Sequence, residues 1–428
     1  MTPLGDLANV FKAFIGANFL SIPFAVKSFG LALSLCVLLM IAVATRLGVY
    51  LLVWSKRSLS VCANSSSYGF VAERLLGVWA FRAVETCLLL TQFGFCVGYV
   101  IFVSQTLSEL LPLGTAWCIV IVGALEAGLG LIRSVKLLSP FSAIANITLF
   151  SAFVMCVIYE TTLLAERGVA SGVQAVDWSG FPLFFGMATS AYEGIGCILP
   201  VENGMGRENK PKFFNFLDLS LVGLSTILVL FGTTSYLCFG DSLHDIIVQD
   251  IANNSWLVGP LKVCLIIGIL LTYPLQMLPV FRILERILLT VANEPERQTQ
   301  PESTEALLEH SASETGEIRK RNRRRKRRFD KQLHLSLSSV LRLSIVVATA
   351  ILAFVVPSFH SIVSLVGSFG SAFLAFILPP FLYLSACNLR GEDPPRSQRY
   401  ALYALVVFGI AGGNVGTFYS IRDVLSLQ

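Results

Sequence analysis

The sequence predicts an all-α polytopic membrane protein with about eleven transmembrane helices, and two observations carry this prediction. Hydrophobic residues make up 54% of the 428 residues and charged residues only 14%, whereas soluble proteins average about 25% charged residues. Apolar runs long enough to cross a bilayer recur from one end of the chain to the other. We therefore expect one transmembrane domain over residues 1–428, without a separate soluble domain.

The apolar runs give the expected spans in chain order: residues 7–28, 30–54, 82–107, 115–132, 140–160, 181–203, 214–239, 257–281, 338–356, 360–386 and 400–424. Most of the 32 Lys and Arg residues fall in the loops on one side of these spans. Because cytosolic loops carry an excess of Lys and Arg, this bias predicts a cytosolic N terminus and a C terminus outside or in a lumen. Asn253, in the sequon Asn-Asn-Ser, then lies in an outer loop and is a glycosylation candidate.

One long polar segment, residues 291–336, separates the eighth and ninth spans. Its first part is rich in Glu, Ser, Thr and Gln and is expected to be disordered. Its second part contains a basic run at residues 319–328. This run either contacts anionic lipid or only anchors the cytosolic side of the next span. Nucleic-acid binding is not expected of a segment held between two spans.

The first and sixth spans do not resemble ordinary membrane helices. Each has a polar patch with glycine near its middle and a proline within two turns, and both residue types weaken a helix. The patches comprise Gly16, Ala17 and Asn18 in the first span, and Tyr192, Glu193, Gly194 and Gly196 in the sixth. Lipid offers no water to free backbone groups, so a broken helix survives where it lines a cavity or a ligand. The alternative is that these residues only kink their helices.

Two breaks five spans apart indicate a carrier built from two inverted five-helix repeats, with one extra C-terminal helix. Half-helix ends supply N–H groups that suit a substrate carboxylate and carbonyl groups that suit an ammonium or a cation. An amino acid zwitterion needs both. We therefore expect the residues of the two breaks to bind the substrate.

Several segments resemble the amino acid/auxin permease (AAAP) family, and most closely its proton-coupled amino acid transporter branch and the vacuolar relatives of that branch. The resemblance covers nearly the whole chain and is carried by Phe184–Met205, by Phe11–Lys27, by Tyr236–Asp241, by Gly268–Gln276, and by Val366–Ser371 with Pro379 and Pro380. It implies eleven helices, a LeuT-like core and coupled transport of small amino acids. At the first break the family usually has Gly-Thr-Gly or Gly-Ser-Gly, whereas this chain has Asn18 at the third position.

Three residues are candidates for coupling transport to an ion. A carboxylate in mid-membrane is costly, and exclusion of water favours its neutral form, so Glu193 is a candidate proton carrier or, alternatively, a structural cap for unwound backbone. Lys12 lies about one turn before the first break, where its ammonium could replace a sodium ion, unless it extends to the cytosolic surface. Thr272 keeps sodium coupling open, because its hydroxyl could bind Na⁺. Gln92 and Tyr99 are weaker candidates for the pocket lining.

These features favour a secondary active transporter of small neutral amino acids, driven by protons, in the plasma membrane or a vacuolar or lysosomal membrane. The alternatives are a carrier that uses sodium, a carrier of cationic amino acids, polyamines or an auxin-like acid, and an amino acid-sensing receptor without net flux. The ten cysteines and four histidines form no metal-binding spacing. We therefore expect no metal, no cofactor and no enzymatic activity.

Overall fold

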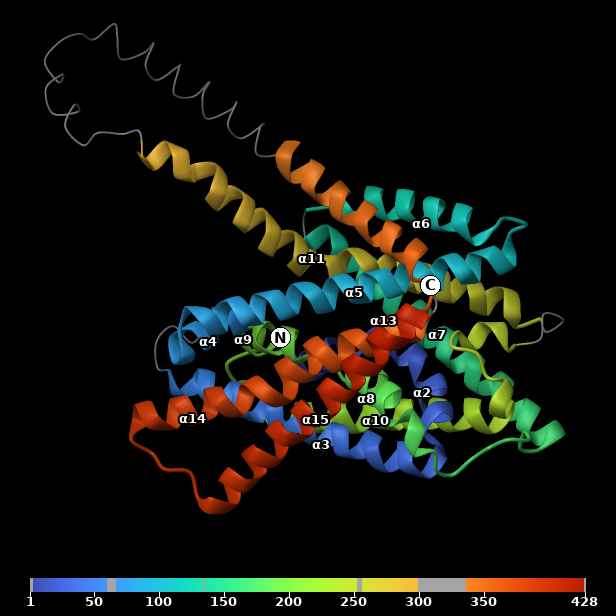
Figure 1. Cartoon of the computed structure of the whole chain (residues 1–428), viewed down its shortest axis with the longest axis horizontal. Coiled ribbons are helices and arrows are strands. Elements are labelled where there is room, and N and C mark those ends of the chain that lie inside the picture. Colours follow the sequence, from blue (N-terminus) through green and yellow to red (C-terminus); the bar gives the residue numbers. More distant parts are fainter. Residues whose placement is uncertain (1–2, 60–66, 134, 252–255, 299–335, 427–428) are drawn as a thin grey trace, which may run out of the picture.

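The computed structural model describes residues 3–59, 67–133, 135–251, 256–298 and 336–426 (Figure 1). Every regular element in these ranges is helical. Asn253 and the basic run at 319–328 lie outside the described residues, so the predictions made for them stay predictions. The helices are α1 (Pro3–Phe14), α2 (Ile22–Phe29), α3 (Leu31–Ser58), α4 (Tyr68–Leu76), α5 (Val78–Leu110), α6 (Thr115–Gly130), α7 (Val135–Arg167), α8 (Phe181–Ala191), α9 (Ile195–Gly204), α10 (Phe213–Phe239), α11 (Val258–Gln298), a helix at Ser336–Val355, α13 (Phe359–Val366), α14 (Leu378–Arg390) and α15 (Arg396–Ser426).

Short elements join some of these helices. A 3-10 helix, η1 (Ala17–Ser21), connects α1 to α2. Two π-helical segments, η7 (Gly367–Ser371) and η8 (Phe373–Ile377), connect α13 to α14. Wide π turns inside a helix are frequently found at functional sites. The segments η7 and η8 therefore make this span a candidate part of a functional site.

The described residues contain eight helices that are long and apolar enough to cross a membrane, and the bent pair Pro3–Phe14 and Ala17–Phe29 makes a ninth. The two remaining predicted spans fall on α6, which has only 16 residues, and on the short helices α8 and α9. The all-α membrane fold predicted from the sequence is therefore confirmed, while eleven as the number of spans stays a prediction.

Two elements differ from the expected boundaries. The short helix α4 was not expected, because nine residues are too few to cross a bilayer. Its N terminus is capped by Ser67, whose hydroxyl accepts a hydrogen bond from the Phe70 N–H. Helix α11 continues to Gln298, so residues 291–298 are helical although the sequence assigned them to the linker, and this stretch includes Pro295, which disfavours a helix.

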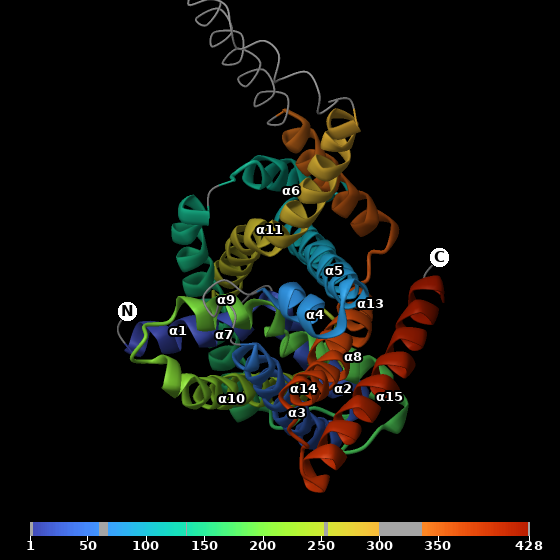
Figure 2. The same cartoon turned by 90° about the vertical axis from the view of Figure 1, so that its left-hand side faces the viewer.

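The long helices run side by side, so the molecule has two opposite faces (Figures 1 and 2). The N-terminal face, seen in Figure 2, carries the start of α1, helix α4 and residues 205–212. The opposite face carries residues 168–180 and 240–251 and the end of α15. Helix α2 packs against α8 and α10, and α8 packs against α13 and α15. The two broken spans therefore lie inside the bundle, with other helices around them.

Glycine allows the closest of these contacts. A Cβ on Gly367 in η7 would lie 1.9 Å from the carbonyl oxygen of Gly186 in α8, and a Cβ on Gly186 would lie 2.2 Å from the carbonyl oxygen of Ser364. Small residues allow helices to approach closely within membranes. This contact holds η7 directly against the sixth span, next to its break.

Candidate functional site

Both predicted breaks are present in the structure. Helix α1 ends at Phe14, and the chain is extended at Gly16, with φ −127° and ψ 175°, before η1 begins. Helix α8 ends at Ala191, and α9 begins only at Ile195. Neither η1 nor α9 has a side-chain cap at its N terminus. Helix ends that no side chain caps remain available to a ligand.

The two breaks touch each other. A Cβ on Gly194 would lie 2.4 Å from a ring carbon of Phe14 and 2.8 Å from the carbonyl oxygen of Ala13, so this position needs a glycine. The Asn18 side-chain amide donates a hydrogen bond to the Ser190 carbonyl at 3.3 Å. Residues far apart in sequence thus form one site, as the paired breaks predict.

A cavity of about 360 Å³ lies at the junction of the breaks, within the range of small-molecule pockets. It is bounded by the first and sixth spans together with α5, α7 and α11. Eight residues that the sequence singled out line it: Lys12, Gly16, Asn18, Gln92, Glu193, Gly194, Gly196 and Thr272. The same walls contain polar residues that the sequence analysis missed, namely Ser142 and Asn146 in α7, Ser190 in α8 and Gln276 in α11.

The polar groups at this junction are incompletely hydrogen-bonded. Within the described residues, both carboxyl oxygens of Glu193 are buried without a hydrogen-bond partner, as is the side-chain oxygen of Asn18. The hydroxyl oxygens of Ser368 and Ser371 in η7 are also buried without a hydrogen-bond partner among the described residues. Buried polar groups are nearly always paired, so a cluster of unpaired ones calls for an explanation such as a ligand or water. The cluster therefore makes this junction the candidate binding site.

Three candidate residues do not line the cavity. Ala17 is buried behind the first break. The Tyr99 hydroxyl lies beside Ala17, 3.7 Å from the position that a Cβ on Gly16 would take, and so supports the break from behind. The Tyr192 hydroxyl is 2.8 Å from the Ser225 hydroxyl in α10, which directs the ring to that helix and away from the cavity.

Lys12 in α1 and Thr272 in α11 both line the cavity, and Lys12 is exposed. The Lys12 ammonium has no hydrogen-bond or ion-pair partner among the described residues. The Thr272 hydroxyl donates a hydrogen bond to the Gly268 carbonyl at 2.7 Å, which leaves its lone pairs able to accept.

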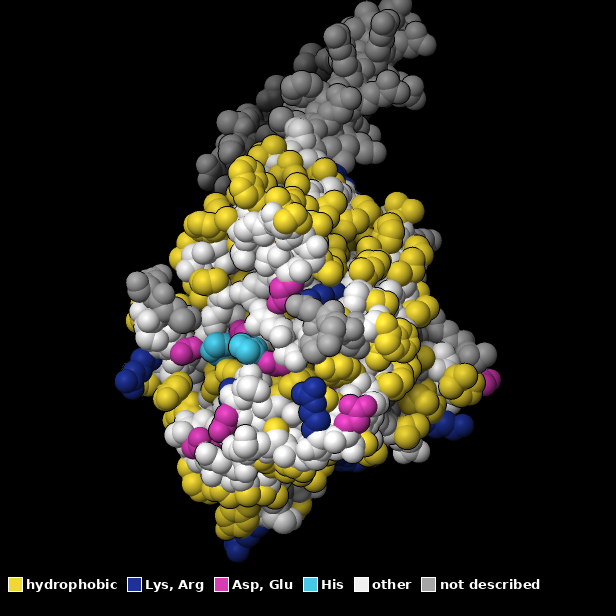
Figure 3. All heavy atoms as spheres, turned by 90° about the vertical axis from the view of Figure 1, so that its right-hand side faces the viewer, with side chains coloured by type: hydrophobic (Ala, Val, Ile, Leu, Met, Phe, Trp, Pro, Cys, Tyr) yellow, Lys and Arg dark blue, Asp and Glu magenta, His cyan; other side chains and the backbone are white. Residues whose placement is uncertain are grey.

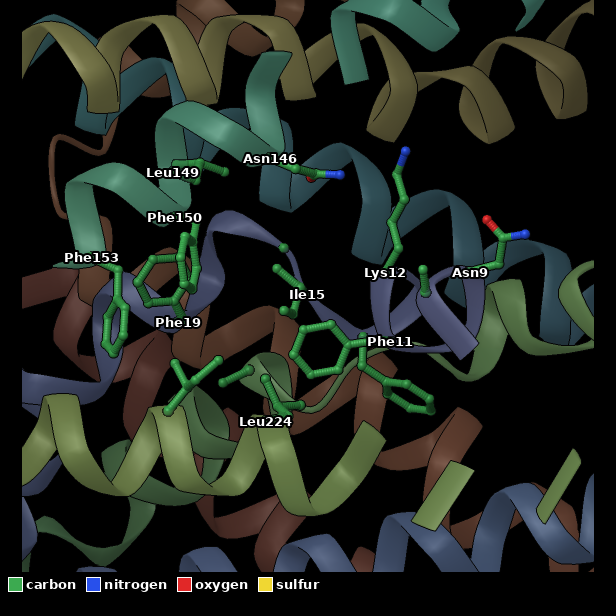
Figure 4. Close-up of a pocket in the computed structure, with 15 residues that line it drawn as sticks. Asn9, Phe11, Lys12, Ile15, Phe19, Asn146, Leu149, Phe150, Phe153 and Leu224 are labelled. Atoms are coloured by element: carbon green, nitrogen blue, oxygen red, sulfur yellow. The ribbon is translucent and has the colours of Figure 1, made fainter. Parts of the chain in front are cut away.

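A second, apolar cavity of about 310 Å³ adjoins the first and shares Lys12, Phe14, Ile15, Gly16 and Asn146 with it. Figure 4 shows the aromatic rings of Phe11, Phe19, Phe150 and Phe153 around this space. The figure also shows the Lys12 amine and the Asn146 amide on the same side of the cavity. The first break thus separates a polar compartment from an apolar one.

The polar cavity extends toward the N-terminal face. Its lining residues beyond the breaks belong to α1, to the beginning of α7 and to the second half of the membrane part of α11, which all lie on that side. On the opposite side, five of the eight residues of α2 are buried and none is exposed. The lining residues Lys12 and Cys197 are exposed, so we take the cavity to open toward the N-terminal face.

Contacts between charged and polar groups close the opposite face. The Lys27 ammonium donates hydrogen bonds of 2.8 Å to the carbonyls of Asp241 and Leu243. His360, at the start of α13, lies 3.1 Å from an oxygen of Asp245 and 3.2 Å from an oxygen of Asp423. Burial raises the pKa of Asp245, but the hydrogen bond and the charge of His360 lower it by more, so the net pKa is below its usual value.

A bundle of membrane-length helices with two broken spans that meet at a buried polar cavity is the architecture of a membrane carrier with discontinuous helices. The chain belongs to the family described as "Transmembrane amino acid transporter protein", whose profile matches residues 2–422. It is accordingly a transporter and not an enzyme.

Similar proteins agree with this assignment. Amino acid transporter AVT3C of Arabidopsis thaliana is 28% identical, over 98% of this chain and 91% of the relative. Vacuolar amino acid transporter 4 of Saccharomyces cerevisiae is 27% identical, over 96% of this chain and 57% of the relative. Among solved structures, that of MhsT in complex with L-phenylalanine has a TM-score of 0.54 at 12% identity and covers 98% of both chains. This similarity confirms the LeuT-like fold expected from the sequence.

Proposed function

We propose that this chain is a secondary active transporter of small neutral amino acids, driven by a proton gradient and working by alternating access. One observation carries the proposal: the two breaks meet at a cavity where Glu193 and Asn18 present buried oxygens without partners in the described part of the chain. Such a site offers both signs of partial charge to a zwitterion.

The amino acid backbone would bind between the half-helix ends. Helix α9 begins at Ile195, and its N-cap residue Gly194 provides no capping side chain, so the N–H groups of its first turn can bind the substrate carboxylate. The carbonyl groups at the ends of α1 and α8, together with the Asn18 side-chain oxygen, can accept hydrogen bonds from the substrate ammonium. The substrate side chain would then extend along the cavity walls, where Asn18 takes up space that glycine would leave open.

Glu193 is the proposed proton carrier. A buried carboxylate without a partner is costly when ionised, and protonation removes this cost. Binding of a proton and of an ammonium at one carboxyl group links the two ligands. Sodium remains the alternative coupling ion, because Thr272 also lines the cavity. The Lys12 ammonium, which lines the same cavity, would repel a sodium ion.

We assign the protein to a vacuolar membrane, with the N-terminal face in the cytosol. Relatives named vacuolar amino acid transporters support the membrane, and the Lys and Arg bias of the loops supports the orientation. In that arrangement the cavity opens toward the cytosol and the His360 cluster faces the lumen.

The test uses purified protein in liposomes and labelled L-alanine, L-proline, L-leucine and L-lysine. Exchange of labelled for unlabelled amino acid is measured first, followed by uptake under an imposed pH gradient and under an imposed sodium gradient. We expect exchange of the small neutral members and accumulation driven by the pH gradient. Accumulation driven by sodium alone would reject proton coupling, whereas binding without exchange in sealed vesicles would favour a receptor.

A further inference from the structure

A groove between α3 and α10 lies on the outside of the bundle and shares no lining residue with the polar cavity. The two helices run side by side (Figures 1 and 2). The groove has a volume of about 790 Å³, and its lining is apolar except for Arg46, Asp218 and two residues with hydroxyl groups. Val43 and Val222 at its rim are 67% and 63% exposed. Because both helices are long and apolar enough to cross a membrane, the medium that covers this apolar surface is lipid.

One end of the groove carries an ion pair that is open to its surroundings. The Arg46 Nε donates a hydrogen bond of 2.7 Å to one carboxylate oxygen of Asp218, and Nη2 donates one of 3.2 Å to the other. The two side chains are still 46% and 42% exposed. The remaining guanidinium N–H groups have no acceptor among the described residues. Charged groups that face lipid are costly unless other polar groups reach them, so this pair calls for a polar partner from outside the chain.

The ion pair lies at the level of a membrane boundary. The part of α10 from Asp218 to its end at Phe239 is about 30 Å long, which is the thickness of the hydrocarbon core. Figure 3 shows charged side chains on the opposite face and hydrophobic ones on the flanks of the molecule. One turn from the ion pair, the rings of Tyr50 and Phe214 pack 5.2 Å apart, and tyrosine is typical of the membrane–water interface. The pair therefore lies at headgroup level on the N-terminal side.

The apolar part of the groove has the length of one lipid leaflet. It runs from the ion pair toward the middle of the bilayer and reaches Leu230 on α10, about 18 Å from Asp218 along the helix. Half of the hydrocarbon core is about 15 Å thick. The groove thus fits an acyl chain whose head group lies at Arg46 and Asp218.

The two charges distinguish between head groups. The free N–H groups of Arg46 suit a phosphate, because a guanidinium binds phosphate oxygens through parallel hydrogen bonds. The Asp218 carboxylate beside it attracts a protonated primary amine and repels a second anionic group. A choline nitrogen carries only methyl groups and methylene and therefore has no N–H to donate to this carboxylate.

We propose that the groove binds a zwitterionic lipid with a phosphate and a primary ammonium, as in phosphatidylethanolamine, from the leaflet on the N-terminal side. Arg46 binds the phosphate, Asp218 binds the ammonium and an acyl chain fills the groove. The site also adjoins the second break, because Ser225 lines the groove and its hydroxyl is 2.8 Å from the hydroxyl of Tyr192. The bound lipid thus packs against the contact that orients Tyr192, the residue before Glu193.

The test measures which lipid stays bound to the purified protein. The whole chain is reconstituted in equal amounts of phosphatidylethanolamine, phosphatidylcholine and phosphatidylglycerol with the same acyl chains, extracted in mild detergent and weighed by native mass spectrometry. We expect retained phosphatidylethanolamine to exceed each of the other lipids by on the order of tenfold, which is the effect of one hydrogen bond to a charged group.

Two variants remove different parts of the site. Arg46→Gln combined with Asp218→Asn replaces both charges by amides that can still bond to each other, and should reduce the preference to less than about twofold. Val222→Trp fills the groove and should reduce retained phosphatidylethanolamine to the level of phosphatidylcholine. Leu219→Trp is the matched control, because Leu219 is an exposed residue of α10 outside the groove, and should keep the wild-type preference.

Each other outcome would overturn the inference. Equal retention of the three lipids by the wild-type protein would show unselective boundary lipid, and a preference for phosphatidylglycerol would show that Asp218 does not bind an ammonium. A mass of two chains that Val222→Trp reduces to one would show that a second copy covers this face. Since Val222 is exposed, its variant decides the matter if the amide variant does not fold. The measurement is of binding, so its result is independent of the proposed transport.

Discussion

At the scale of the residue, four buried glutamates differ in how their carboxyl groups are partnered. Glu202 pairs with Lys56 and Arg57. Glu160 accepts hydrogen bonds from the hydroxyls of Thr234 and Ser235. Glu126 has one oxygen without a partner in the described part of the chain, and Glu193 has two. Because an ionised carboxylate is stable in the membrane only with partners, Glu193 gains the most from binding a proton or a substrate ammonium.

The substitution Glu193→Gln keeps the size of this side chain and removes its titration. We expect accumulation driven by a pH gradient to fall by on the order of tenfold or more, while exchange at equal pH continues, since the amide resembles the protonated acid. Glu126→Gln is the matched control, because Glu126 is buried in α6, away from the cavity. This variant should still accumulate substrate under a pH gradient. A variant of Glu193 that loses exchange and accumulation to the same extent would indicate a structural role.

Lys12→Met tests whether the ammonium occupies the place of a sodium ion. Lys12 has no partner in the described residues and lines the same cavity as Thr272. Removing its charge removes the repulsion of a cation, so we expect weaker drive by protons and a new stimulation of uptake by sodium. Adding Thr272→Val should abolish that stimulation. If transport by the Lys12→Met variant is still driven by protons and does not respond to sodium, then the Lys12 ammonium does not occupy the place of a sodium ion.

Side-chain direction limited the prediction of the site. The sequence pointed to Glu193, Asn18 and Lys12 because polar residues and glycine interrupt long apolar runs there, and these residues line the cavity. It also pointed to Tyr192, whose hydroxyl instead contacts Ser225. It missed Ser142, Asn146 and Gln276, because the side of a helix that faces the cavity depends on how each helix is rotated in the bundle.

At the scale of the element, the contact between α8 and η7 brings the break in the sixth span next to the π-helical segment. Gly367 lies against the backbone of Gly186 at a distance that leaves no space for a methyl group. The bundle thus depends on a backbone contact here rather than on interlocking side chains. The π turns of η7 start at Gly367 itself.

Gly367→Ala is expected to disrupt this packing, since its Cβ would overlap the Gly186 carbonyl. Overpacking of this kind costs about 1–3 kcal/mol or more, so we expect a lower melting temperature in detergent and loss of transport. Gly128→Ala in α6 is the matched control, because a Cβ there meets nothing within 4 Å and alanine favours a helix by about 1 kcal/mol. Equal melting temperatures for the two variants would show that η7 moves away from α8 without cost.

The sequence predicted the elements that lie in long apolar runs and missed the short helix α4. Both breaks were visible because glycine and proline interrupt long apolar runs there, together with Asn18 in the first span and Glu193 in the sixth. Helix α4 was missed because its nine residues are held by tertiary contacts: the Tyr68 hydroxyl donates to the Leu374 carbonyl, and the Ser385 hydroxyl to the Leu75 carbonyl. The π turns depend on close packing with α8, which no local sequence pattern records.

At the scale of the whole molecule, the two faces are closed in different ways. On the opposite face, Lys27, His360 and their carboxylate and carbonyl partners connect α2, residues 240–245, α13 and α15. On the N-terminal face, the Asp6 carboxylate accepts a hydrogen bond of 2.7 Å from Asn209, and Lys56 pairs with Glu202. These last contacts connect α1 and α3 to the end of the sixth span but leave the cavity open toward the N-terminal face. Alternating access would require the contacts of the opposite face to separate when the cavity closes on this side.

Cys197 reports which face is open, because it is exposed and lines the polar cavity. In a variant that keeps Cys197 and replaces the other nine cysteines, an impermeant maleimide should label the protein from the N-terminal face only. Molecules in the correct orientation are recognised by protease removal of an N-terminal tag from outside the liposome. Transported amino acid should slow the labelling, since it occupies the cavity and favours the closed form. A matched variant that keeps only Cys96, which is fully buried, should stay unlabelled. Labelling of Cys197 from the opposite face would mean that the resting protein opens to the other side, and the contacts of His360 with Asp245 and Asp423 would then lie on the open side and would not close the pathway.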